Sequence, residues 1–149
     1  MRLLPRHGTA GDGYERSLLT HVLIVEDREA DRNLLKMLLE RNDYRVTAAG
    51  DGVEALAAAR RDRPDAIVSD VLMPNMDGFV LCHTWMQDAE LREIPFIFHS
   101  AHLTSRQDEH VAMALGAVRY LVKPLEAGVF LLELRTVLQQ WAERSRPRA

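Results

Sequence analysis

The chain has 149 residues, of which 47% are hydrophobic, and a net charge of -3 from 19 basic and 22 acidic residues. A chain of this length forms one domain with a full core, because folding buries roughly 70% of its unfolded surface. Its interspersed charges give no field that favours nucleic acid or an anionic membrane, so we expect neither partner. The single cysteine, Cys82, excludes an internal disulfide and a multi-cysteine metal site, and is expected to be a small buried side chain on a helix.

The two ends of the chain differ in composition from its middle. Residues 1–19 contain glycines and a proline but no apolar run of signal-peptide length, so we expect a flexible leader. Residues 143–149 have the basic, proline-containing composition of a linker or tail. The folded domain is therefore predicted over 20–142, in a cytoplasmic protein without a transmembrane segment.

Short β-rich segments alternate with helical patterns along this domain. Five strands are predicted, over 21–25, 44–49, 66–69, 96–99 and 119–122. Each is followed by a predicted helix, over 28–42, 52–62, 79–87, 105–116 and 127–141. In the first helix, Ala30, Leu34, Met37 and Leu38 are predicted to form the buried face. Five β-then-α units with short links require right-handed crossovers, and hence a doubly wound parallel sheet with helices on both faces.

Polar side chains follow the strands of this predicted sheet. Glu26 and Asp27 come after the first strand, Asp70 after the third, Ser100 after the fourth and Lys123 after the fifth. Each has an ordinary structural explanation when taken alone, such as Asp27 capping a helix. Ligands bind at the carboxyl ends of the strands in such sheets, so together these residues predict a site.

Three carboxylates in one pocket repel each other unless a cation is present. Mg²⁺ suits such a site, since it keeps several waters and needs only a few carboxylates. Asp70 could then act as a nucleophile toward phosphorus, while Lys123 and Ser100 contact the transferred phosphoryl oxygens. The expected product is an aspartyl phosphate.

These motifs resemble the receiver domain of two-component response regulators, over roughly residues 20 to 142. The likeness rests on "VLIVED", "PDAIVSDVLMPNMDGF", "SA" at 100–101 and "YLVKPL". It implies a flavodoxin-like sheet of five strands in the order 2-1-3-4-5, with five helices.

The resemblance also implies a set of site residues. Mg²⁺ would be held by Glu26, Asp27, Asp70 and the main-chain carbonyl of Leu72. Asp70 would accept a phosphoryl group from a histidine kinase, a histidine phosphotransfer protein or a small phosphodonor.

Further residues carry the expected switch. Ser100, Ala101 and Lys123 would bind the phosphoryl group, and Tyr120 would rotate inward when Ser100 moves. Pro124 matches the family's cis peptide. For Tyr120 an ordinary packing role in the sheet stays open.

Two departures from the common pattern and the last helix raise further questions. Leu72 and His102 lie at positions that vary within the family and influence the lifetime of the phosphoryl group, while His99 stands where a small or aliphatic residue is frequent.

The last helix has more apolar area than one face needs, so it either buries more than usual or supplies a homodimer or output surface.

Several functions remain open from the sequence. The favoured function is a phosphorylation-switched module that is not an enzyme beyond its own phosphorylation and dephosphorylation, and that contacts an unidentified output protein. The alternatives are an intermediate receiver of a relay or hybrid kinase, a degenerate scaffold and an aspartyl-nucleophile phosphatase. A phosphatase would need an acid two residues after Asp70, where this chain has Leu72.

Overall fold

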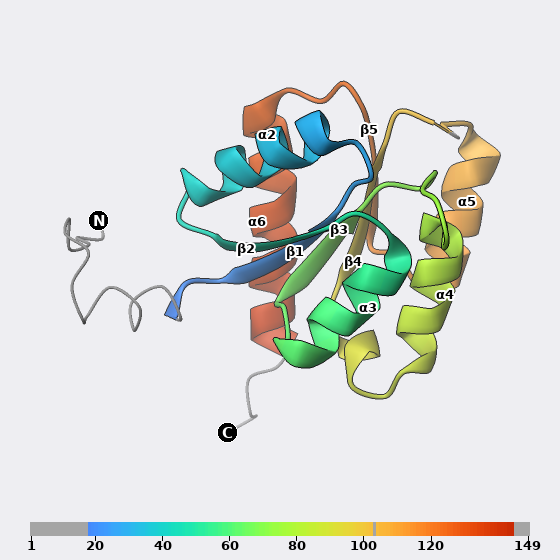
Figure 1. The fold of residues 1–149 in the computed structure, drawn as a ribbon, viewed down its shortest axis with the longest axis horizontal. Coiled ribbons are helices and arrows are strands. Elements are labelled where there is room, and N and C mark those ends of the chain that lie inside the picture. Colours follow the sequence, from blue (N-terminus) through green and yellow to red (C-terminus); the bar gives the residue numbers. More distant parts are fainter. Residues whose placement is uncertain (1–17, 103, 145–149) are drawn as a thin grey trace.

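The computed structural model describes residues 18–102 and 104–144 of the chain. Its centre is a parallel sheet in the order β2-β1-β3-β4-β5, which confirms the expected fold (Figure 1). Residues 1–17 of the predicted leader and 145–149 of the predicted tail lie outside the described residues. No described helix has both the length and the hydropathy required to cross a bilayer.

The elements lie close to their predicted positions. The strands are β1 (His21–Val25), β2 (Arg45–Ala49), β3 (Ala66–Ser69), β4 (Phe96–Ser100) and β5 (Arg119–Val122). The helices are α2 (Glu29–Glu40), α3 (Gly52–Arg61), α4 (Gly78–Gln87), α5 (Arg106–Leu115) and α6 (Ala127–Arg144), with a 3-10 turn η1 (Leu91–Glu93) before β4. Since α6 continues to Arg144, its last two residues belong to the segment predicted as the tail.

The two faces of the sheet are covered by different helices (Figure 1). Alternate strand residues point to opposite faces, so Ile24, Val68 and Ile97 pack with α2 and α6. Leu23, Ile67 and the phenylalanines of β4 point the other way, into a core shared with α3, α4 and α5. The five strands thus separate two hydrophobic cores.

The core on the side of α4 contains a row of aromatic rings. Trp85 lies edge-on to Phe96, with ring centroids 5.9 Å apart. Phe96 contacts Phe98 at 4.9 Å, and Phe98 contacts Tyr120 at 5.8 Å. The buried indole of Trp85 donates a hydrogen bond to the carbonyl of Ile94, which leaves its polar atom satisfied.

The predicted buried face of α2 is confirmed for Leu38 and wrong for Ala30, Leu34 and Met37. Leu34 is 68% exposed and Met37 is 48% exposed, and Ala30 is also on the surface. Leu39 is buried instead, while Leu35 and Leu38 pack against the core shared with α6. The helix is therefore rotated by about one residue from the expected orientation, and it presents Leu34 to solvent.

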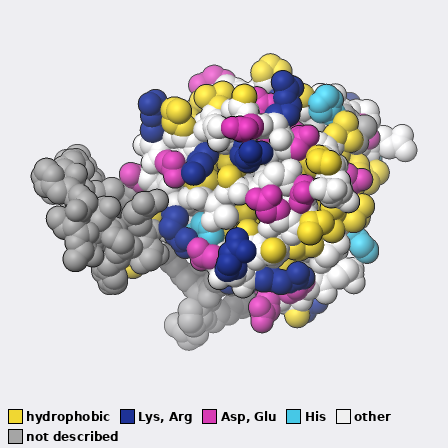
Figure 2. All heavy atoms as spheres, viewed as in Figure 1, with side chains coloured by type: hydrophobic (Ala, Val, Ile, Leu, Met, Phe, Trp, Pro, Cys, Tyr) yellow, Lys and Arg dark blue, Asp and Glu magenta, His cyan; other side chains and the backbone are white. Residues whose placement is uncertain are grey.

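An apolar stripe of α6 faces the sheet. Phe130, Leu134 and Val137 are buried, and Trp141 is partly buried at the end of the stripe. Val129 and Leu132 are 42% and 53% exposed on the other side of the helix. On the face shown in Figure 2, basic and acidic side chains are mixed with hydrophobic ones, without a large area of a single charge.

Cys82 is fully buried on α4, as predicted. Burial raises the pKa of its thiol to about 12, because the thiolate would lose its hydration. We expect native protein to react with a thiol reagent such as DTNB far more slowly at pH 8 than protein unfolded in guanidinium. Rapid stoichiometric reaction of the native protein would contradict this burial.

Candidate functional site at the carboxyl edge of the sheet

The polar residues predicted at the strand ends come together at one edge of the sheet. Glu26 follows β1, Asp70 follows β3, Ser100 ends β4 and Lys123 follows β5. Glu26, Asp70 and Ser100 are 4%, 7% and 0% exposed, which is unusual for side chains of this polarity. Burial of this kind requires compensating partners.

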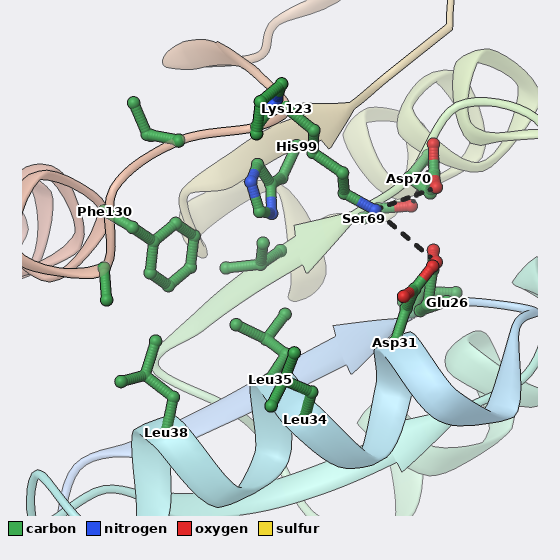
Figure 3. Close-up of a pocket in the computed structure, with 15 residues that line it drawn as sticks. Glu26, Asp31, Leu34, Leu35, Leu38, Ser69, Asp70, His99, Lys123 and Phe130 are labelled. Atoms are coloured by element: carbon green, nitrogen blue, oxygen red, sulfur yellow. Dashed lines mark hydrogen bonds and ion pairs between the residues drawn. The ribbon is translucent and has the colours of Figure 1, made fainter.

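The side chain of Lys123 supplies the central partner. Its Nζ lies 3.3 Å from Asp70 Oδ2 and 3.4 Å from Glu26 Oε1, so one ammonium group bridges two buried carboxyls (Figure 3). The backbone N–H of Val71 donates to the other oxygen of Asp70, Oδ1, at 2.7 Å. The peptide bond from Lys123 to Pro124 is cis.

The pKa values of the Glu26 and Asp70 carboxyl groups are shifted in opposite directions. Burial, followed by the neighbouring Asp70, raises the pKa of Glu26 to about 8, although Lys123 opposes the shift. Burial would also raise the pKa of Asp70, but the neighbouring side chains of Glu26 and Ser100, the charge of Lys123 and the Val71 N–H together lower it. Within the pair, these opposite shifts favour the negative charge on Asp70 and the proton on Glu26.

Ser100 has two competing hydrogen-bond acceptors. Its hydroxyl donates to the carbonyl of His102 at 2.9 Å and accepts from the His102 N–H at 3.1 Å, while its proximity to Asp70 helps to lower the pKa of that carboxyl. A serine hydroxyl has one proton, so donation to His102 and donation to Asp70 exclude each other. Tyr120 is half-buried, and its hydroxyl lies 3.5 Å from the same His102 carbonyl. Ala101 follows on the exposed β4–α5 loop.

Asp27 and Leu72 lie at the outer margin of the site, and both are exposed. Arg32 of α2 donates to the carbonyl of Glu26 at 2.9 Å and lies 3.4 Å from that of Asp27, so it holds the acidic loop by its backbone. Ser69 similarly donates to the carbonyl of Asp70 at 2.7 Å. Neither role is visible in the sequence, since a side chain that binds a backbone carbonyl leaves no motif.

The donor set at this edge fits a hard divalent cation. Glu26 Oε2 is buried without a hydrogen-bond partner, and Asp70 offers ionised oxygens beside it. Among residues 18–102 and 104–144, no three His, Cys, Asp or Glu side chains already converge as a metal-binding cluster. A cation here could draw on the two buried carboxyls, the exposed Asp27, carbonyl oxygens and waters, which is the kind of coordination typical of Mg²⁺.

A cavity of about 440 Å³ adjoins the site between α2 and α6 (Figure 3). His99 lines it, with its ring 4.9 Å from that of Phe130 and its Nε2 buried without a partner. Burial, followed by the charge of Lys123, lowers the pKa of His99 to about 4, although Asp70 opposes the shift. His99 is therefore packed at the end of β4, against Phe130.

The burial of His99 predicts a loss of stability in acid. Its pKa falls from 6.5 in the unfolded chain to about 4 in the folded one, so between these values the unfolded chain binds more protons. The free energy of unfolding therefore decreases as the pH drops from about 6.5 to about 4, by at most about 3 kcal/mol from this residue. We expect His99→Phe, which can still pack on Phe130, to flatten this part of the pH profile measured by urea unfolding.

The parent and His99→Phe should also be compared at pH 8, where His99 is neutral in both the folded and the unfolded parent. This comparison separates the effect of packing from that of protonation. A difference that is the same at pH 8 and pH 5 would assign the effect of His99→Phe to packing alone.

Known proteins share this sequence pattern and fold. Residues 22–135 match the response regulator receiver domain family. The chain is 39% identical over 116 residues to the response regulator PleD of Caulobacter vibrioides, covering 78% of this chain and 25% of that protein. It is 36% identical over 128 residues to the transcriptional regulatory protein CseB of Streptomyces avermitilis, covering 86% of this chain and 53% of that protein. The chain thus spans between a quarter and about half of these relatives.

Solved structures of receiver proteins are also similar to this chain. The chemotaxis protein CheY4 of Vibrio cholerae superposes with a TM-score of 0.76 and 34% identity, covering 80% of this chain and 98% of that one. The signal receiver domain of a histidine kinase from Syntrophus aciditrophicus also gives 0.76, with 32% identity and coverage of 87% and 96%. The match over 22–135, the strand order and the polar residues at the strand ends lead to one conclusion: this chain belongs to the response regulator receiver domains of two-component signalling.

Proposed function

We propose that Asp70 accepts a phosphoryl group in a Mg²⁺-dependent reaction and that the product switches a protein-interaction surface. The main support is that Asp70 is buried yet ionised, with Lys123 Nζ at 3.3 Å and the Val71 N–H at 2.7 Å. An ionised oxygen held among fixed positive groups is a suitable nucleophile for phosphorus.

The proposed step forms one bond and breaks one. A carboxylate oxygen of Asp70 attacks phosphorus, and the bond from phosphorus to the donor's nitrogen or oxygen breaks. The bound metal would neutralise charge on the transferring phosphoryl oxygens. Glu26, Asp70, Asp27 and the carbonyl of Leu72 are the proposed ligands. Lys123 already lies against both buried carboxyls and would move onto a phosphoryl oxygen.

The switch would act through Ser100. A phosphoryl group on Asp70 offers stronger acceptors than the carbonyl of His102, which the Ser100 hydroxyl now contacts at 2.9 Å. Transfer of that hydrogen bond would pull the β4–α5 loop toward the site and change the contact of Tyr120 with His102. A local change of charge would thereby shift a two-state surface.

The direct test is incubation with Mg²⁺ and acetyl phosphate, followed by intact mass measurement. We expect the gain of one phosphoryl group, its removal by hydroxylamine and no gain when EDTA is present. Absence of an adduct in Mg²⁺, or an adduct that resists hydroxylamine, would overturn the proposal.

A second candidate role is intermediate transfer within a relay. It is supported by the likeness to a receiver domain of a histidine kinase from Syntrophus aciditrophicus. A relay receiver returns its phosphoryl group to a histidine phosphotransfer protein, whereas a terminal regulator keeps it. Mixing phosphorylated protein with phosphotransfer proteins and following the label would separate the two roles.

We also propose that histidine kinases or histidine phosphotransfer proteins supply the phosphoryl group in the cytoplasm.

We further propose that a second copy of this chain or an output protein binds α6. The exposed Val129 and Leu132 on α6 support a contact there. Sedimentation with and without beryllofluoride tests the homodimer. A monomer at every concentration in both states would exclude it.

A further inference from the structure

The loop between β3 and α4, residues 71–77, is fastened to the first turn of α3. Asn75 donates its side-chain amide to Asp51 Oδ2 at 2.7 Å. Asp51 is the N-cap of α3, and its other oxygen accepts from the Glu54 N–H at 2.9 Å. The bond from the Glu54 N–H has the larger effect in lowering the pKa of Asp51, and the bond from Asn75 adds to it. The Asp51 carboxylate thus accepts hydrogen bonds from both the helix and the loop.

A second contact lies beside this hydrogen bond. A Cβ on Gly52 would lie 2.9 Å from Cγ and Sδ of Met76, so the Met76 side chain covers the first helical residue of α3. Asn75 itself has a φ of 66°, a left-handed conformation that asparagine tolerates better than most residues. The tip of the loop is therefore shaped by Asn75 and docked through two neighbouring side chains.

The base of the same loop is the phosphoryl site. The Val71 N–H donates to Asp70 Oδ1, and the Val71 carbonyl accepts from the Gly78 N–H at 2.6 Å. Between this base and the docked tip lie only Leu72 and Met73 before Pro74. With both ends held, the short segment that presents the Leu72 carbonyl has little freedom.

We propose that Asn75 is a positioning residue for the phosphoryl site, acting through Asp51. Its hydrogen bond holds the tip of the loop on α3 and so fixes the Val71 N–H and the Leu72 carbonyl relative to the carboxylate of Asp70. The inference rests on the proposed function, because the Leu72 carbonyl and Asp70 are proposed there as magnesium ligands.

Two substitutions remove the hydrogen bond and keep what surrounds it. Asn75→Gly retains the left-handed backbone and loses the amide. Asp51→Ser retains an N-cap oxygen for α3 and loses the second acceptor. Asn42→Gly is the matched control, since it removes another exposed amide bond, to the Leu38 carbonyl at 2.8 Å at the end of α2.

The experiment measures Mg²⁺ affinity of the unphosphorylated chain from NMR shifts, together with hydrogen exchange of the Val71 and Gly78 amides and the rate of phosphorylation by acetyl phosphate. We expect Asn75→Gly and Asp51→Ser each to weaken Mg²⁺ binding by about three- to tenfold and to speed exchange at Val71. The double variant should bind Mg²⁺ no more weakly than the single variant with the lower affinity. Both substitutions remove the same hydrogen bond, so their effects should not add. Asn42→Gly should match the parent in all three measurements.

The outcomes separate positioning from stability. A lower thermal midpoint with parental Mg²⁺ affinity would make the contact structural only and overturn the inference. Fully additive losses in the double variant would overturn coupling through Asp51. Failure of the parent to gain a phosphoryl group would overturn the proposed function instead, and a parent that binds no Mg²⁺ would overturn both.

Discussion

Asp70→Asn is expected to abolish the phosphoryl adduct formed with Mg²⁺ and acetyl phosphate. The amide has nearly the shape of the carboxylate but lacks the charged oxygen that attacks phosphorus. The variant should fold, because Lys123 keeps Glu26 as its partner at 3.4 Å. Without Asp70 the pKa of Glu26 should fall below its value of about 8, since the negative charge of Asp70 and its hydrogen bond, which both raise that pKa, are lost. Intact mass measures the first effect and NMR titration of Glu26 the second.

Asp77→Asn is the matched control for this substitution. Asp77 lies in the same loop and caps α4 by accepting from the Val80 N–H, a role that asparagine also performs. We expect this variant to gain the phosphoryl group as the parent does. An adduct on Asp70→Asn, or loss of the adduct in Asp77→Asn alone, would show that the acceptor has been misassigned.

Gly78→Ala is expected to be the most damaging small substitution in the loop. A Cβ at this position would lie 2.2 Å from the carbonyl oxygen of Asp70 and 2.9 Å from the Cα of Val71. Both are backbone atoms, so relief requires movement of the strand end that carries the nucleophile. We expect a loss of roughly 3 kcal/mol in the free energy of unfolding by urea, together with slower phosphorylation.

Gly50→Ala provides the comparison. The nearest atoms to its Cβ would be the side-chain tips of Glu54 and Arg32, at 3.6 and 3.7 Å, so the methyl group fits without displacing backbone. We expect its stability to stay within about 0.5 kcal/mol of the parent. Equal losses at Gly50 and Gly78 would mean that the close approach at Gly78 has no special consequence.

The architecture was predictable because short β-rich segments alternate with helical patterns along the chain. For example, the helix predicted over 105–116 ends on a glycine, and α5 stops there because Gly116 adopts a left-handed φ of 117°. The orientation of α2 was not predictable from periodicity. Its leucines and methionine form two overlapping stripes, and only the fit against β1 and α6 selects Leu35, Leu38 and Leu39 over Leu34 and Met37.

The site likewise contains residues that the sequence predicts and one that it does not. Glu26, Asp70, Ser100 and Lys123 could be predicted because the ends of parallel strands meet at one edge whatever the details of packing. Arg32 could not, because it acts on the backbone carbonyls of a loop five and six residues earlier in the chain. Such a contact depends on the path of the loop, which has no periodic signature.

The row of aromatic rings from Trp85 to Tyr120 has a spectroscopic consequence. Because each ring contacts the next, at centroid separations of 5.9, 4.9 and 5.8 Å, movement of the Tyr120 ring changes the surroundings of Phe98 and, through it, of the buried indole. We therefore expect the near-ultraviolet circular dichroism of Trp85 to change when the Tyr120 ring moves at the β5 edge. A Trp141→Phe background would isolate this signal, so conformational change at Tyr120 can be followed without attaching a dye.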